Sequence, residues 1–285
     1  PHILSWQRVG RRMLLVAVVV GSAPSVWSAA CPPDSVAVGP LCVDRYEASV
    51  WEVPASSQAA KARKLLAEGR ATRRDLERAG AIQRGVVDDY PCGRHGNDCP
   101  DTLIAASLPG VQPAAAPSWF QAQQACAAAG KRLLTSAEWQ MAAAGTADPG
   151  PNNGLLNAKC NTDSCSFGGA CTARATALAG ATPGDATGCV SRWGVEDLVG
   201  NLEEWVADWV PVAPGVGCTT WPASLGDDLS CLNDSVPGGL PAALVRGGHY
   251  FNAGTGTTAG VFAVNSANAA EGGFGARGFR CARPQ

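Results

Sequence analysis

Zinc-binding patterns, long apolar segments and an excess of one charge are all lacking in this sequence. It contains three histidines and no Cys-x-x-Cys pair, so a zinc site built from cysteine and histidine is not expected. The formal net charge is −2, which gives no field that would draw the chain to nucleic acid or to an anionic membrane surface. No stretch is apolar for long enough to predict a membrane-spanning helix.

Glycine and proline are plentiful, whereas charged residues are sparse. The chain has 34 glycines, 20 prolines and only 16% charged residues among its 285 residues. The length is sufficient for one large domain or two ordinary ones. This composition favours a loop-rich globular fold over a bundle of long helices.

Residues 1–30 have the features of a secretory signal peptide. Arg11 and Arg12 precede an apolar run at residues 13–21, which is too short to span a bilayer. Small residues before and at Ala30 would permit cleavage after it. A buried strand is the alternative interpretation of the apolar run. We therefore expect an extracytoplasmic protein, whether secreted, periplasmic or lipid-anchored.

Cleavage after Ala30 would place Cys31 at the mature N-terminus, where a lipid anchor could be attached. Ser28 argues against the anchor, because lipoprotein signals usually carry an aliphatic residue at that position. A disulfide at Cys31 is the competing expectation.

All twelve cysteines follow the predicted signal peptide. An even number of cysteines in an exported chain is typical of a disulfide framework. The spacing suggests three local bridges, namely Cys31–Cys42, Cys92–Cys99 and Cys218–Cys231. The protein is therefore expected to be rich in disulfides and to carry no free thiol.

Short periodic segments with clear end signals predict both strands and helices. Residues 35–47 alternate apolar residues around Gly39 and Pro40, which predicts a hairpin. One helix is predicted over residues 118–130, and a second begins with a capping box at Thr135 and ends at Gly145. Residues 146–192 are expected to form a loop, and short strands are expected near residues 243–251 and 278–282.

A basic segment interrupts this pattern at about residues 55–85. Between residues 57 and 84 there are eight lysines or arginines and three acidic residues, with leucines at loosely helical spacing. The segment predicts one or two surface helices in an insertion. Its charged face is either simply solvated or a partner-binding arm.

Four sequence motifs occur in the order in which one protein family carries them. They are "VDRYEAS", "AGKRLLTSAEWQMAAAG", "GVEDLVGNLEEWVADW" with "VRGGHYF", and the closing "GFRCAR". The set resembles the formylglycine-generating enzyme family, also called sulfatase-modifying factors, over roughly residues 35–283 apart from the insertion. The resemblance implies one domain over residues 31–285 with the family's variant of the C-type-lectin-like fold. This is an α+β class, disulfide-rich and low in regular secondary structure.

The third motif contains the candidate metal site. The resemblance implies that calcium binds the side chains of Asp197 and Glu204 and the main-chain carbonyls of Gly200 and Leu202. Calcium takes six to eight oxygen ligands, which carboxylates and carbonyls can share in a flexible shell. Asp197 replaces an amide found in some members, which adds negative charge. A solvated acidic turn without a metal is the alternative.

The resemblance also makes two structural predictions around this site. The cysteine of the first helix pairs in the family with that of the closing motif, which gives Cys126–Cys281 here. Behind the acidic turn we expect a short helix that places Trp205 and Trp209 on its core face.

The positions that hold copper in catalytic members carry other residues here. Those members use two cysteines after the R-G-G segment, and the matching positions are Asn252 and Thr257. Copper(I) prefers soft thiolates, and no cysteine lies between Cys231 and Cys281. Copper is therefore not expected as a cofactor.

His249 stands where many family members have serine. A lone histidine is more often a hydrogen-bonded structural group than a catalytic base, and both roles are open. Together with Asn252 and Thr257 it marks a candidate groove.

Two functions are compatible with these residues. The first is an exported, calcium-stabilised binding or accessory module, a pseudoenzyme that lacks the oxidase chemistry and recognises an unknown protein or peptide ligand. The second is a formylglycine-generating oxidase that matures sulfatases by oxidising a substrate cysteine.

Overall fold

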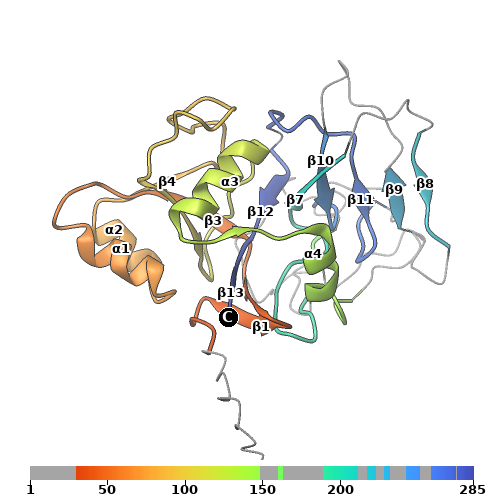
Figure 1. Cartoon of the computed structure of the whole chain (residues 1–285), viewed down its shortest axis with the longest axis horizontal. Helices are drawn as coiled ribbons and strands as arrows, with labels where there is room; N and C mark the ends of the chain where they lie inside the picture. The colour runs from red at the N-terminus through yellow and green to blue at the C-terminus, as the bar shows by residue number, and fades with distance from the viewer. Residues whose placement is uncertain are drawn as a thin grey trace, which may run out of the picture.

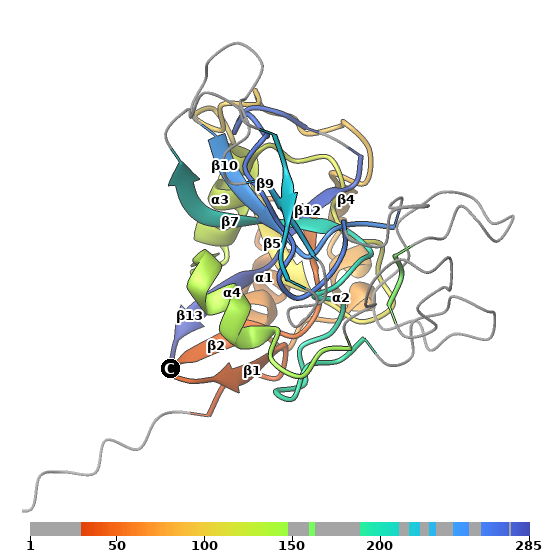
Figure 2. The ribbon, with the colours of Figure 1, turned by 90° about the vertical axis from the view of Figure 1, so that its right-hand side faces the viewer.

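The computed structural model describes residues 30–147, 160–162, 189–210, 217–222, 228–231, 242–250, 258–273 and 275–285. These residues contain four helices, and their strands form three sheets (Figures 1 and 2). The helical insertion and the strands β8 and β9 lie at opposite ends of the molecule (Figure 1). No helix among the described residues has the length and hydrophobicity to cross a bilayer.

The first sheet brings the two ends of the described chain together. β1 (Ser35–Val38) and β2 (Leu41–Asp44) form the predicted hairpin around Gly39 and Pro40. β13 (Cys281–Pro284) pairs with β2 on one side and with β6 (Arg132–Leu133) on the other. The C-terminus therefore lies beside the β1–β2 hairpin, near its turn, in both ribbon views (Figures 1 and 2).

The second sheet has six strands and carries the third motif. Its order is β12-β7-β10-β11-β9-β8. The bounds are β7 (Glu203–Val210), β8 (Thr219–Thr220), β9 (Leu229–Cys231), β10 (Ala242–Arg246), β11 (Val264–Asn265) and β12 (Arg277–Phe279). β7 pairs antiparallel with β10 and parallel with β12, so it is bonded on both edges.

The prediction of a helix after the acidic turn is wrong, because β7 occupies that position. Trp205 and Trp209 are four residues apart, a spacing that places side chains on one face of a helix and equally on one face of a strand. Trp205 is buried in the core, whereas Trp209 is 42% exposed and packs against Trp119 and Phe120. Hydrogen bonding to the two neighbouring strands makes this segment a strand rather than a helix.

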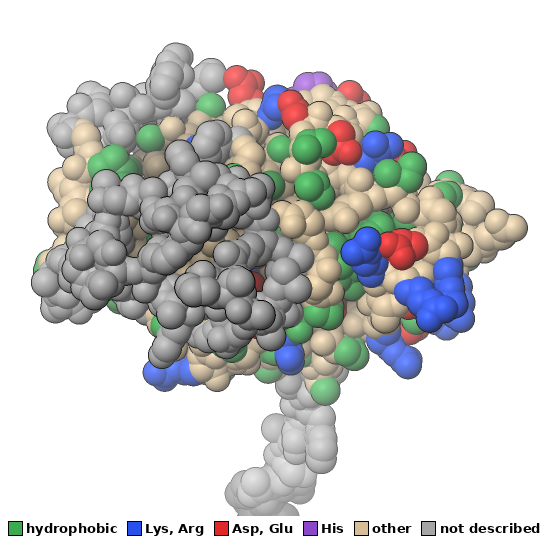
Figure 3. Space-filling model, turned by 180° about the vertical axis from the view of Figure 1, so that it is seen from behind, with side chains coloured by type: hydrophobic (Ala, Val, Ile, Leu, Met, Phe, Trp, Pro, Cys, Tyr) green, Lys and Arg blue, Asp and Glu red, His purple; other side chains and the backbone are tan. Residues whose placement is uncertain are grey.

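The third sheet has the strand order β4-β3-β5, and the insertion lies between β3 and β4 in the sequence. Its strands are β3 (Ala48–Glu52), β4 (Ile82–Arg84) and β5 (Leu103–Ser107). Between β3 and β4 lie α1 (Ala60–Ala67) and α2 (Arg73–Arg78), which bury mainly Leu66 and Leu76. Lysine and arginine side chains gather at the end of the molecule that carries these helices (Figure 3). The structure therefore has two helices where the sequence predicted one or two surface helices.

The two remaining helices begin as predicted. α3 (Trp119–Ala128) and α4 (Ser136–Ala142) each open with a capping box, at Ser118 and Thr135 respectively. α4 ends three residues before Gly145, earlier than the sequence suggested. α3 packs on β5, and the core around it contains Trp205, Phe279 and Leu103.

Five disulfides tie the described segments together. They are Cys31–Cys42, Cys92–Cys99, Cys126–Cys281, Cys160–Cys189 and Cys218–Cys231. The bridge implied by the family resemblance and all three local bridges are thus confirmed. Cys165 and Cys171 lie outside the described residues.

The Cys31–Cys42 bridge bears on the lipid anchor considered for Cys31. One sulfur atom cannot carry both a thioether to a lipid and a bond to another cysteine. With Cys31 bridged to Cys42, the structure disagrees with an anchor at this residue.

Candidate functional site

The acidic turn of the third motif has an unusual backbone. Asp197 and Asn201 have φ values of 58° and 56°, and Gly200 has a φ of 76°. Aspartate and asparagine tolerate this left-handed region better than other side chains, and glycine adopts it freely. The sequence thus places permissive residues at the positions where the turn reverses direction.

Glu47 holds the turn from the side of the first motif. Its Oε1 accepts a hydrogen bond from the Leu202 N–H at 2.9 Å, and its Oε2 accepts one from the Asn201 side chain. Asn201 also donates its N–H to the Asn161 carbonyl at 2.8 Å. A buried carboxylate that accepts such bonds fixes the orientation of the peptide groups around it.

Glu204, the next predicted ligand, lies in a buried network with Arg280. The guanidinium donates to both carboxylate oxygens, with Nε at 2.8 and 2.9 Å and Nη2 at 2.5 Å. Trp139 donates its indole Nε1–H to Glu204 Oε2 at 2.8 Å. All three side chains are almost fully buried.

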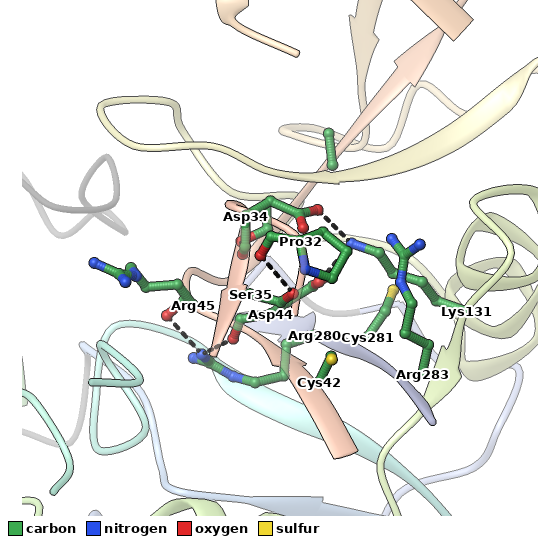
Figure 4. Close-up of polar contacts among 12 residues, drawn as sticks. Pro32, Asp34, Ser35, Cys42, Asp44, Arg45, Lys131, Arg280, Cys281 and Arg283 are labelled. Carbon is green, nitrogen blue, oxygen red and sulfur yellow. Dashed lines mark hydrogen bonds and ion pairs between the residues drawn. The ribbon is translucent and has the colours of Figure 1, made fainter. Parts of the chain in front are cut away.

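Arg280 also donates to main-chain carbonyls of two distant segments. It bonds the carbonyls of Asp44 and Arg45 at 3.3 and 3.2 Å, as Figure 4 shows, and that of Glu196 at 2.8 Å. The first motif therefore supplies Glu47 and these carbonyls, and the other three motifs supply Trp139, Glu204 and Arg280. The four motifs of the sequence meet at one buried polar network.

The turn carries more negative than positive charge. Burial raises the pKa of Asp197 to about 7, although Arg280 partly offsets that rise. Burial raises the pKa of Glu47 well above its usual range, and the carboxylates of Asp197 and Glu204 raise it further. A cation placed among these groups would favour their ionised forms.

Three of the four predicted calcium ligands accept no hydrogen bond at their candidate oxygens from the described part of the chain. Among the described residues, no N–H or O–H donates to the carboxylate of Asp197 or to the carbonyls of Gly200 and Leu202. Glu204 is different, because both its oxygens already accept hydrogen bonds from Arg280 and Trp139. The four candidate ligands offer only hard oxygen atoms, which are the ligands that calcium takes. Glu204 would bind the ion with a carboxylate that also accepts hydrogen bonds from Arg280 and Trp139.

The candidate groove begins at the Arg246-Gly247-Gly248 segment. A Cβ at Gly247 would lie 2.4 Å from the Leu198 carbonyl oxygen, and one at Gly248 would lie 2.4 Å from that of Thr258. Both glycines also have positive φ values. No other residue could bring the backbone so close to its neighbours, which explains the paired glycines of the motif.

Arg246 is a structural residue within the groove wall. It donates to Ser136 Oγ at 2.8 Å and to the Ala263 carbonyl at 2.9 Å, and its guanidinium lies over Trp139, 4.7 Å from the ring centroid. These contacts fix α4 against the loop that follows β10.

His249 lines a cavity of about 170 Å³ beside this arginine. The other polar side chains of its wall are Glu203, Arg246, Thr258 and Asn265, with Leu229, Val245 and Val264 among the apolar ones. Burial lowers the pKa of His249, and the Glu203 charge partly offsets this, so the neutral imidazole is favoured at pH 7. Asn252 and Thr257 lie outside the described residues.

Sequence reasoning missed Glu47 and Arg280, although both stand in motifs that it singled out. A charged residue that is buried needs a partner, because an unpaired buried charge is too costly. The sequence does not show which partner it has, since Glu47 and Leu202 are more than 150 positions apart.

Comparison with known families gives one match over most of the chain. The family model described as "Sulfatase-modifying factor enzyme 1-like domain" matches residues 91–285. No curated protein sequence matches the chain.

Similar folds occur among solved structures at low identity. The U1 variant of the Major Tropism Determinant is 17% identical, with a TM-score of 0.45 over 90% of this chain, and the chain spans about half of that protein (54%). CarF is 16% identical over 86% of both chains, with a TM-score of 0.42. PvdO from Pseudomonas aeruginosa is 19% identical over 91% of both chains, with a TM-score of 0.42.

Proposed function

Because the chain belongs to the sulfatase-modifying factor enzyme 1-like domain family, we propose that it is an exported, calcium-stabilised binding or accessory module without oxidase activity. It keeps the family's variant of the C-type-lectin-like fold, an α+β arrangement stapled by disulfides. Its groove around His249 takes a protein or peptide ligand.

The state of the cysteines is the observation that carries this proposal. Every described cysteine is in a disulfide, so none of them offers a thiolate. At the two positions of the copper pair the sequence has Asn252 and Thr257, an amide and a hydroxyl. Both are hard ligands, whereas copper(I) depends on soft sulfur.

The calcium part of the proposal is supported by the acidic turn. Asp197, Gly200 and Leu202 would hold the ion with oxygens that accept no hydrogen bond from described residues, and Glu204 would complete the set. The ion would offset the excess charge of Glu47 and its acidic neighbours. Its role is structural, since it would fix the turn that leads into β7.

A single assay separates the module from the alternative oxidase. The purified protein is incubated with copper(I), oxygen and a peptide that carries the sulfatase cysteine motif. We expect no conversion of the peptide cysteine to formylglycine by mass spectrometry. We also expect copper(I) binding no tighter than that of a denatured, thiol-blocked control. Catalytic turnover of the peptide would establish the oxidase instead.

Calcium is tested by melting temperature with and without a chelator. An ion that binds only the folded state stabilises it by about 2.7 kcal/mol at a concentration 100-fold above its Kd. We expect the chelator to lower the melting temperature of the wild type and to leave Asp197→Gly unchanged. Glycine is chosen because it accepts the positive φ of residue 197 without strain.

Glu196→Gln is the matched control, because it removes one negative charge at the neighbouring position. This variant should keep the full sensitivity to chelator. Equal sensitivity in the wild type and Asp197→Gly would rule out the proposed ligand.

A further inference from the structure

The side chains of a lysine and two aspartates, which none of the preceding sites uses, lie together in the core. Lys131 follows α3, Asp34 precedes β1 and Asp44 ends β2, and Figure 4 shows their side chains pointing toward one another. Lys131 Nζ is 2.5 Å from Asp44 Oδ1 and 2.7 Å from Asp34 Oδ2. The three side chains are 2%, 0% and 9% exposed for Lys131, Asp44 and Asp34 respectively.

This arrangement is an incomplete ion cluster. The Lys131 ammonium and the nearby guanidinium of Arg283 face two carboxylates. The second carboxylate oxygens, Asp34 Oδ1 and Asp44 Oδ2, are buried and accept no hydrogen bond from a described residue, and the Nε and Nη2 atoms of Arg283 have no acceptor among those residues. Burial raises the pKa of Asp44 to about 6, although the Lys131 charge partly offsets that rise. The raised pKa makes the neutral carboxylic acid form of Asp44 easier to reach than that of an exposed aspartate.

The backbone holds the three groups rigidly. Each of them lies within five residues of a disulfide cysteine: Cys31 precedes Asp34, Cys42 precedes Asp44 and Cys126 precedes Lys131. Gly69 of the insertion closes the cluster on another side, since a Cβ there would lie 2.2 Å from Asp34 Oδ1. The reacting groups are thus fixed in contact and shielded from water.

We propose that Lys131 and Asp44 condense to form an intramolecular isopeptide bond, with Asp34 as the proton shuttle. A buried amine held against a carboxyl group has an effective concentration that solution chemistry never reaches, on the order of 10⁵ M or more. Exclusion of water also protects the amide from hydrolysis.

The reaction balances without any co-reactant. The ammonium of Lys131 first passes one proton to the Asp44 carboxylate, which gives a neutral amine and a carboxylic acid. Nζ then bonds to Cγ of Asp44, and Asp34 moves a second proton from the nitrogen to the hydroxyl oxygen. The C–O bond breaks, water leaves, and the amide keeps the last proton on nitrogen. The charges of Lys131 and Asp44 are removed, and those of Asp34 and the nearby Arg283 remain.

The bond would join the first hairpin to the segment between α3 and β6. Asp44 lies on β2 and Lys131 directly before β6, and β13 separates these two strands in the sheet. The crosslink would therefore clamp β13, which carries Cys281 of the longest-range disulfide. Unlike the disulfides, it would survive reduction.

Mass spectrometry of the reduced and alkylated full chain tests the proposal. We expect one crosslinked peptide that contains Lys131 and Asp44 and is lighter by one water than the sum of its two parts. Trypsin should fail to cleave after Lys131. Recovery of the two separate, unmodified peptides would overturn the proposal, and this readout needs no variant to fold.

Two variants sharpen the assignment. Lys131→Arg keeps the positive charge but has no nucleophilic amine, so its peptides should be recovered separately from a folded protein, as judged by circular dichroism. Asp44→Asn should give the same crosslinked mass as the wild type, because ammonia replaces water as the leaving group. A crosslink that persists in Lys131→Arg, or one that joins Lys131 to Asp34, would contradict the assignment.

Discussion

The buried clusters around Arg280 and Lys131 place cations of different shape against carboxylates. Arg280 presents a planar guanidinium with five N–H donors, which reach both oxygens of Glu204 and three main-chain carbonyls. Lys131 presents a compact ammonium, which reaches one oxygen of each of two aspartates and leaves the others without donors.

This difference in hydrogen bonding makes the Arg280 cluster a structural anchor and the Lys131 cluster a reactive site. A fully bonded guanidinium lowers the energy of the buried charge and has no proton that it can give up at ordinary pH. An ammonium between two carboxylates can pass its proton on and become a nucleophile. The same kind of ion pairing thus stabilises the first cluster and prepares the second for chemistry.

Removal of Arg280 should give the largest effect. Arg280→Met leaves Glu204 buried without its partner, and breaking such a pair costs about 3–5 kcal/mol. Urea unfolding in the presence of chelator measures this without a contribution from calcium. The double variant Arg280→Met/Glu204→Gln should recover part of the loss, because no uncompensated charge remains. A loss below about 1 kcal/mol in the single variant would show that the network is not an anchor.

Glu138 forms an ion pair with Arg132 that is only partly buried, so it allows the effect of exposure to be compared with that in the buried clusters. Its two oxygens bond Arg132 at 2.7 Å each, and this hydrogen bonding, with the capping bond from Thr135, lowers its pKa despite partial burial. A lowered carboxyl pKa gives stability that is present above about pH 4.3 and is lost as pH falls through the folded value. Glu138→Gln should cost about 0.5–1 kcal/mol at pH 7.

The pH dependence of this variant provides the check. The difference in unfolding free energy between wild type and Glu138→Gln should disappear in strong acid, where both side chains are neutral. A constant difference across the whole pH range would assign the effect to packing rather than to charge.

The smallest effect is expected at the insertion. Arg73 and Glu77 of α2 are 2.7 Å apart, but their side chains are 60% and 50% exposed. Exposed pairs at this spacing contribute about 0.3–0.5 kcal/mol and are screened by salt. Arg73→Ala should therefore change the melting temperature little. Lys64→Ala, from an exposed pair at 3.8 Å, should change it less still.

Several features of the fold follow from local sequence. The capping boxes at Ser118 and Thr135 and the hairpin turn at Gly39 were predictable because neighbouring residues make the hydrogen bonds or adopt the turn dihedrals. The four motifs indicated the family, and with it the Cys126–Cys281 bridge and the candidate ligands at Asp197 and Glu204. The exposed basic helices also followed from spacing and charge.

Other features were decided only by contacts between distant segments. Whether residues 203–210 form a helix or a strand depended on β10 and β12, which satisfy the backbone groups of β7 from both edges. The partners of Glu204 and Lys131 come from segments 65 to 97 residues away. The sequence by itself determined which residues could turn, cap or carry charge, because those preferences act over a few bonds. Only the tertiary structure decided which charges are buried together, because burial and long-range pairing arise when the sheets assemble.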